Sequence, residues 1–310
     1  MTRFLKSLAT AGSALALALS SGACSQADTP APATASATPV TAADYVTPAL
    51  WMLQDEDTTI YLFGTVHLLP KDVEWFDGRI VTALQSSDEL VTELIIDDPN
   101  KVVSAFMANG ALPEGQNLRD LMSAEDRAEY EAALTAYGVP VETFDRMEPW
   151  LAAVWLGQLP LMQGGFDGEN GVETVLERAV PGKPRGALED LQVQIDMFDG
   201  LPMDAQIEYL DATVESLDEM GPFVDSLVAE WLAGDVDDLA ELVSGDYDDD
   251  PVLYQRLFTN RNASWTAWID DRMDRPGTVF IAVGAGHLGG RDSVQSMLEA
   301  RGFTVTRVTE

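Results

Sequence analysis

The chain has 310 residues, with 52 acidic and 18 basic side chains, and its formal net charge at pH 7 is −34. This balance excludes nucleic acid as a partner, because nucleic-acid binding needs a basic surface. It fits a soluble exported protein or one with a cationic ligand. The single cysteine excludes an internal disulfide and a cluster of thiolate metal ligands.

The first 23 residues are typical of an export signal. Arg3 and Lys6 precede an apolar stretch, residues 9–20, that is too short to cross a bilayer comfortably. Small residues follow and lead directly to Cys24. We therefore expect an exported protein that is either lipid-anchored to a bacterial membrane through Cys24 or cleaved to a soluble periplasmic or secreted product.

Residues 24–42 are almost entirely Ser, Ala, Thr, Pro and similar small or polar residues. Such a segment has little apolar surface to bury, so it predicts a flexible tether. The remaining chain, residues 43–310, is long enough for one large domain or two intertwined lobes.

The domain begins with a predicted strand–helix–strand unit. Ala49 to Gln54 and Thr58 to Val66 flank an acidic turn and indicate a β-hairpin. Trp75 to Gln85 has a helical pattern, and Glu89 to Ile96 is typical of a buried strand. A right-handed crossover would make the strands before and after this helix parallel, with their carboxyl ends at one edge of the sheet.

The middle of the chain has mostly helical patterns, and its end returns to strands. Ser123 is a predicted helix N-cap. Helices are expected over Val141 to Leu161, Gly171 to Ala179, most of residues 190–274 and Arg291 to Arg301, with strands over Pro184 to Leu188, Thr278 to Val283 and Phe303 to Val308.

Two histidines occur in the chain, and each ends a Gly-x-x-His motif that follows an apolar run. The motifs are Gly64 to His67 and Gly284 to His287, and a leucine follows each of them. They predict two buried strands whose carboxyl ends present an imidazole, at the sheet edge where open α/β folds build their sites. We expect the two imidazoles to share one site; the alternative is a pair of structural histidines.

These patterns together predict an α/β fold. We expect a central mixed, partly parallel sheet with flanking helices. A largely helical insertion should separate the two Gly-x-x-His strands.

Glu93 lies inside the apolar strand pattern of residues 89–96. A carboxylate there is costly unless it is paired, bound to a metal or exposed at an edge. Two imidazoles and one carboxylate predict a divalent-metal site formed by His67, Glu93 and His287, with positions left open for water. Mn, Co and Zn all suit this set of ligands.

Three more residues are candidates for catalysis. Glu173 is at a helix start and Glu189 follows a short strand, and either would accept the proton of a metal-bound water. Arg261 opens a helix and would bind the substrate or a developing oxyanion. Their ordinary alternatives are a carboxylate on a helix dipole, a surface loop acid and a surface ion pair.

Two familiar patterns are rejected. Gly284 to Gly289 matches G-x-G-x-x-G, but too little chain follows it for a dinucleotide-binding fold. Asp246 to Asp250 resembles the start of a calcium loop but lacks the required glycine and final glutamate, so we expect a solvated acidic loop.

The chain resembles the TraB/GumN family, which is related to the TIKI metalloproteases and more distantly to erythromycin-esterase and ChaN-like proteins. The resemblance covers about residues 47–308 and rests on Pro48–Trp51, Tyr61–Pro70, Glu93, Pro149–Leu151, Gly171–Glu173, Leu188–Glu189, Arg261–Asn262 and Val283–Leu288. It implies an α/β fold with the histidines and glutamates at a common site. The TIKI members are metal-dependent peptidases, so the resemblance also implies hydrolysis.

The leading hypothesis is therefore an exported metal-dependent hydrolase, foremost a metallopeptidase, that acts on a peptide or another small exported substrate. The first alternative is a binding protein that sequesters a peptide or haem without turnover. The second is a metal-free esterase in which His67 is the general base.

Overall fold

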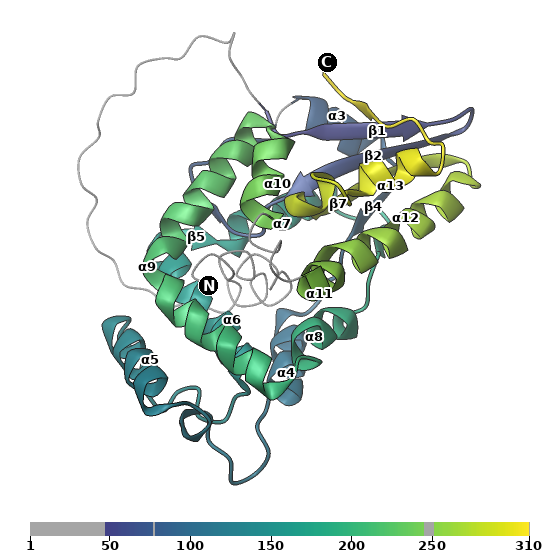
Figure 1. Ribbon diagram of the computed structural model, residues 1–310. Helices are drawn as coiled ribbons and strands as arrows, with labels where there is room; N and C mark the ends of the chain where they lie inside the picture. Colours follow the sequence, from purple (N-terminus) through teal and green to yellow (C-terminus); the bar gives the residue numbers. More distant parts are fainter. Residues whose placement is uncertain (1–46, 77, 245–250, 310) are drawn as a thin grey trace, which may run out of the picture.

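A six-stranded mixed sheet, in the order β6-β4-β7-β2-β1-β8, forms one side of the protein (Figure 1). The computed structural model describes residues 47–76, 78–244 and 251–309, and the predicted leader, tether, Cys24 and acidic loop lie outside them. The strands are β1 (Leu50–Gln54), β2 (Thr58–Thr65), β4 (Glu89–Thr92), β6 (Arg185–Ala187), β7 (Gly277–Gly284) and β8 (Thr306–Arg307). β1 runs against both of its neighbours, and the other pairs are parallel, which confirms the predicted mixed, partly parallel sheet.

The carboxyl ends of the central parallel strands meet at one edge of the sheet. Thr65, the last residue of β2, pairs with Gly284, the last residue of β7. On the other side of β7, Thr92 ends β4 opposite Ala282. The segments that carry His67, Glu93 and His287 therefore leave the sheet side by side.

Each face of the sheet packs against its own apolar core because side chains alternate along a strand. In β7, Val279, Ile281 and Val283 belong to one core, and Phe280 and Ala282 to the other. The first face is covered by α12 (Asn260–Met273) and α13 (Val294–Ala300). The second face is covered by α3 (Gly78–Ser86) and by the long helical insertion.

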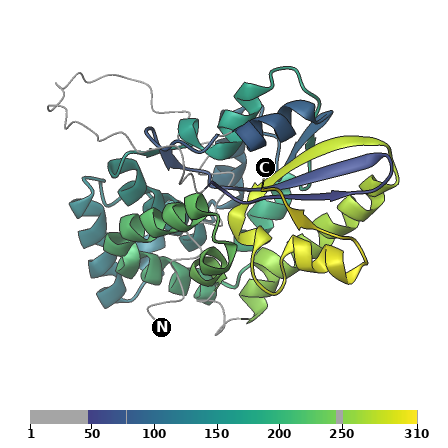
Figure 2. The ribbon, with the colours of Figure 1, turned by 90° about the horizontal axis from the view of Figure 1, so that it is seen from above.

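The helical insertion lies between β4 and β7 in sequence and forms a separate layer beside the sheet (Figure 2). It includes α4 (Pro99–Asn109), α5 (Ala124–Ala136), α6 (Pro149–Gln163), α7 (Val172–Ala179), α8 (Leu191–Asp199), α9 (Met203–Ala233), α10 (Val236–Ser244), α11 (Pro251–Tyr254) and the π-helical turn η4 (Gln255–Thr259). α6 packs along α9, and most of its residues are buried. No helix in the described ranges has the length and apolarity needed to cross a membrane.

Several predicted elements start or end elsewhere. The predicted helix at Trp75 begins at Gly78, because the Trp75 ring stacks on Phe63, with 5.7 Å between ring centroids. The strand predicted to reach Ile96 ends at Thr92, whose hydroxyl donates to the Leu94 carbonyl within a bend.

The helix predicted from Val141 begins at Pro149, because a proline without an N–H group suits the first helical turn. The last helix starts after the N-cap Ser293 rather than at Arg291. The final strand shortens to the two residues of β8, which are exposed.

Candidate active site

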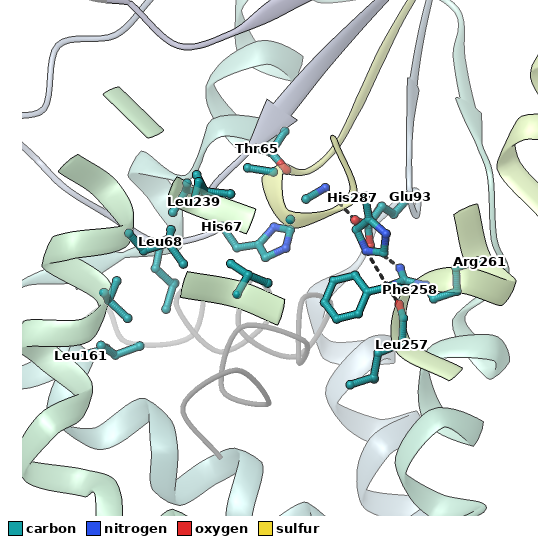
Figure 3. Close-up of a pocket in the computed structure, with 17 residues that line it drawn as sticks. Thr65, His67, Leu68, Glu93, Leu161, Leu239, Leu257, Phe258, Arg261 and His287 are labelled. Atoms are coloured by element: carbon teal, nitrogen blue, oxygen red, sulfur yellow. Dashed lines mark hydrogen bonds and ion pairs between the residues drawn. The ribbon is translucent and has the colours of Figure 1, made fainter. Parts of the chain in front are cut away.

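Both imidazoles and the Glu93 carboxylate surround Gly284 (Figure 3). A Cβ atom on Gly284 would lie 3.1 Å from Glu93 Oε1, 3.5 Å from His287 Cδ2 and 3.8 Å from His67 Nε2. The second glycine motif thus leaves open the space that the three side chains share. Its backbone also serves the site, since the Gly284 N–H group donates to Glu93 Oε1 over 2.7 Å.

His67 is paired with Glu173. Its Nδ1 lies 2.6 Å from Glu173 Oε1, and both side chains are largely buried. The start of α7 holds the carboxylate in place, because the Val172 N–H donates to the Val66 carbonyl and a Cβ on Gly171 would collide with the His67 carbonyl. The close approach of Nδ1 to the carboxylate favours the tautomer that carries its proton on Nδ1, and Nε2 of His67 lies on the side facing Gly284.

The charge of His67 follows from this pairing. Burial alone would lower the pKa of His67, but the Glu173 and Glu93 carboxylates outweigh burial and raise it above 6.5. Glu173 was predicted to accept a proton from water; in the structure it lies behind the imidazole and outside the residues that line the pocket.

Arg261 links two buried carboxylates. Its Nη2 donates to Glu93 Oε2 over 2.7 Å and to Glu189 Oε2 over 3.0 Å, while its Nε donates to Glu189 Oε1 over 2.7 Å. Its Nη1 contacts His287 Nε2 at 2.9 Å and the Leu257 carbonyl at 3.3 Å. These contacts occupy the N–H groups of Nε, Nη1 and Nη2. The geometry therefore favours a positioning role for Arg261 over the predicted oxyanion binding.

The two carboxylates share this one cation unequally. Burial opposes ionisation of Glu93, yet Arg261 and the nearby imidazoles hold the pKa of this carboxyl well below its usual range. Burial keeps the pKa of Glu189 above its usual value, although Arg261 and the Trp265 indole favour the charged form. Glu189 was predicted as a proton acceptor; it lies outside the lining of the pocket and anchors Arg261 instead.

His287 is held in a different state from His67. Its Nδ1 lies 2.6 Å from Asn262 Oδ1, and its Nε2 faces the Arg261 guanidinium. Because a guanidinium only donates, Nε2 accepts and Nδ1 carries the proton. Burial, together with Arg261, lowers the pKa of His287 to about 3, so this imidazole stays neutral. The rings of Phe258 and Trp265 pack against it, with centroids 5.1 and 4.4 Å away.

The site opens into a pocket that holds about 800 Å³ of space, part of it open to solvent. Thr65, His67, Glu93, Arg261 and His287 line it, and the rest of its lining consists of Val66, Leu68, Leu161, Val224, Leu227, Leu239, Val243, Leu257, Phe258, Gly284, Ala285 and Gly286. The Thr65 hydroxyl is buried there without a hydrogen-bond partner among the residues that the structure describes. It is therefore a buried donor beside the pocket that the described residues leave unsatisfied.

The predicted metal ligands do not fit a divalent ion in this arrangement. The Nε2 lone pair of His287 is directed at Arg261, whose positive charge also neutralises Glu93. Across the described ranges, the one group of three His, Cys, Asp or Glu ligand atoms within 4.8 Å of one another is Glu230, Asp235 and Asp238. The structure thus brings His67, Glu93 and His287 into one pocket without converging their ligand atoms.

Some residues of the site were missed in the sequence. Gln194 Nε2 donates to Glu93 Oε2 over 3.1 Å, and Trp265 Nε1 donates to Glu189 Oε1 over 2.9 Å. Trp265 follows Arg261 by four residues on the same helix, so helical spacing offered a signal for it. Gln194 lies in a separate helix, and nothing in its sequence context indicates its role.

Comparisons with known proteins give a family and nothing more specific. No curated protein and no solved structure matches the chain. The model of the TraB/PrgY/gumN family matches residues 49–307, which span the sheet, the helical insertion and both Gly-x-x-His motifs. The chain belongs to the TraB/PrgY/gumN family.

Proposed function

We propose that this protein is an exported hydrolase of ester or amide bonds in which His67 is the general base. The observation that carries the proposal is the His67–Glu173 pair, because it leaves one imidazole nitrogen free to accept a proton at a partly enclosed pocket. A carboxylate behind a histidine general base fixes its tautomer and stabilises the imidazolium that forms.

The reaction needs one water molecule beside His67 Nε2. As the water oxygen bonds to the substrate carbonyl carbon, its proton passes to Nε2, and the Glu173 carboxylate stabilises the resulting imidazolium. The same proton then passes to the leaving oxygen or nitrogen as the carbonyl carbon releases it. His67 is returned to its neutral form.

The Thr65 hydroxyl is the best-supported donor to the substrate carbonyl oxygen. It lines the pocket, is buried, and lacks a partner in the structure, whereas the guanidinium of Arg261 is engaged by Glu93, Glu189, His287 and a carbonyl. A donor that is already in place when negative charge develops on an oxygen lowers the barrier more than one that must reorient.

A metal-dependent peptidase is the second candidate. It is favoured by the position of His67 Nε2 and Glu93 Oε1, which both lie within 4 Å of the same point beside Gly284. This alternative requires His287 Nε2 to separate from Arg261.

The proposal is tested with protein purified without a histidine tag. Hydrolysis of ester and peptide libraries is measured in chelator and again with Mn, Co or Zn. We expect turnover to persist in chelator and to fall about 10²- to 10⁴-fold in His67→Ala, with a smaller loss in Glu173→Gln. Glu169→Gln, a surface carboxylate paired with Arg178, is the matched control and should retain activity.

Each other outcome has a clear meaning. Turnover that requires added metal, together with stoichiometric metal binding lost in both His67→Ala and His287→Ala, would support the metal-dependent peptidase. Ligand binding without turnover under all conditions would contradict hydrolysis and favour a sequestering protein.

A further inference from the structure

The pocket continues beyond His67 into an apolar end. Its walls there come from three helices of the insertion: Leu161 from α6, Val224 and Leu227 from α9, and Leu239 and Val243 from α10. Figure 3 shows His67 between this side, marked by Leu68, Leu161 and Leu239, and the opposite side with His287, Glu93 and Arg261. A group bound at the apolar end would therefore be close enough to belong to the same substrate molecule as the carbonyl that reacts beside His67.

The chemistry of the lining selects the kind of group that fits. Apart from Thr65, His67, Glu93, Arg261 and His287, every described residue of the lining is aliphatic, phenylalanine or glycine. A peptide would bring an N–H and a carbonyl group with each residue, and burying them without partners is costly. The backbone groups of β2 and β7 already pair with each other up to Thr65 and Gly284. They therefore offer no hydrogen bonds to the backbone of a bound peptide.

A hydrocarbon chain has no such requirement, and it gains free energy from contact with aliphatic walls. We propose that the apolar end binds the unbranched hydrocarbon chain of an acyl substrate, so that the enzyme hydrolyses esters or amides of medium-chain fatty acids. This proposal rests on the proposed function, because His67 must act on the carbonyl at the head of that chain.

The balance of the step is that of ordinary hydrolysis. Water supplies the oxygen that bonds to the acyl carbon, the bond from that carbon to the leaving oxygen or nitrogen breaks, and the leaving group takes the proton that His67 carried. No oxidant or reductant is needed.

The first experiment is a chain-length series. The rate constant kcat/KM is measured for 4-nitrophenyl butanoate, hexanoate, octanoate and decanoate. Each methylene that enters the apolar end should raise kcat/KM about three- to fourfold, as expected from the transfer of one CH₂ group out of water. A flat series, or one that falls from butanoate onward, would overturn the proposal.

Two variants on one helix test where the chain lies. Val224 and Val228 are one helical turn apart on α9 and similarly buried, at 6% and 7% exposure, but the pocket is lined by Val224 and not by Val228. Val224→Phe should lower the decanoate-to-butanoate ratio of kcat/KM at least tenfold, whereas Val228→Phe should leave that ratio unchanged. Val224→Ala, which widens the pocket, covers the case in which Val224→Phe does not fold and should move the preferred chain length upward.

Binding without turnover separates this proposal from the proposed function. Neutral alkan-2-ones from six to twelve carbons are titrated into the protein by calorimetry. Affinity that rises with chain length in wild-type protein and falls in Val224→Phe would support the acyl site even if no ester is hydrolysed. Ester hydrolysis with affinities independent of chain length would contradict the acyl site and leave the hydrolase intact.

Discussion

The two Gly-x-x-His strand ends have the same motif and opposite electrostatics. His67 contacts a carboxylate, which raises its pKa above 6.5, whereas burial and a guanidinium lower the pKa of His287 to about 3. β2 and β7 are parallel neighbours whose last residues are paired, so backbone position does not explain the difference. The motif fixes where an imidazole stands, and its neighbours determine whether it exchanges protons or holds other groups in place.

The largest expected effect comes from removing the cation at the His287 end. Arg261→Met leaves Glu93 and Glu189 buried without their shared partner, which should lower the free energy of unfolding by about 3–5 kcal/mol at neutral pH. Denaturant unfolding measures this change. Arg178→Met breaks an exposed ion pair with Glu169 and should cost at most about 1 kcal/mol; equal losses in the two variants would contradict the difference in burial.

The second test compares the histidines directly by stability. His287→Ala removes a ring packed between Phe258 and Trp265 and the contacts that this ring makes with Asn262 Oδ1 and Arg261 Nη1, at a cost of about 3 kcal/mol. His67→Ala leaves only the Glu173 carboxylate without its partner and should lower the free energy of unfolding by about 1 kcal/mol. It should nevertheless abolish most of the activity. Reversed stability losses, read from thermal or denaturant unfolding, would refute the structural role of His287.

The third test concerns the hydroxyl beside His67. Thr65→Val keeps the shape of the side chain and removes a buried donor that has no partner, so the variant should be slightly more stable than the wild type. Activity should nevertheless fall about 10- to 100-fold if the hydroxyl binds the carbonyl oxygen. A variant with unchanged kcat/KM would remove Thr65 from the mechanism.

The smallest expected effect is a difference in titration between the NMR signals of the two histidines, and it tests the comparison between them most directly. The chain has two histidines, so proton NMR of tag-free protein should give two imidazole signals. One should titrate above pH 6.5 and shift to lower pH in Glu173→Gln, and the other should stay neutral between pH 5 and 9. Because the folded-state pKa of His67 is raised, its pair with Glu173 contributes stability that is fully present below pH 6.5 and is lost as pH rises through the higher folded-state pKa. Two signals with the same pKa would break the comparison.

The sequence predicted the architecture more accurately than the contacts between side chains. The hairpin of β1 and β2, the parallel direction of β2 and β4 and the helical insertion all follow from local apolar patterns and turn residues, and the structure confirms them. Element ends were harder: Trp75 and Thr92 leave their predicted helix and strand through tertiary contacts and local hydrogen bonds that periodicity does not encode.

The candidate site shows the same limit. The repeated motif and the lone strand carboxylate were enough to bring His67, Glu93 and His287 to one place in the prediction. Sequence could not show that Arg261 would lie among them, because α12 follows Glu93 by more than 150 residues and its orientation depends on packing against the sheet. Both a metal ion and a guanidinium can compensate the charge of a buried carboxylate, so the sequence alone does not distinguish them. The three-dimensional contacts do.

The position of β7 has a consequence for biogenesis. β2 and β4 are synthesised early, yet they do not pair with each other, because β7 lies between them. Until residues 277–284 have emerged, both strands expose an unpaired edge, and such edges template association between chains. A chain interrupted before Gly277 would therefore lack the central strand of its sheet, so aggregation and proteolysis would compete with folding until β7 has been synthesised.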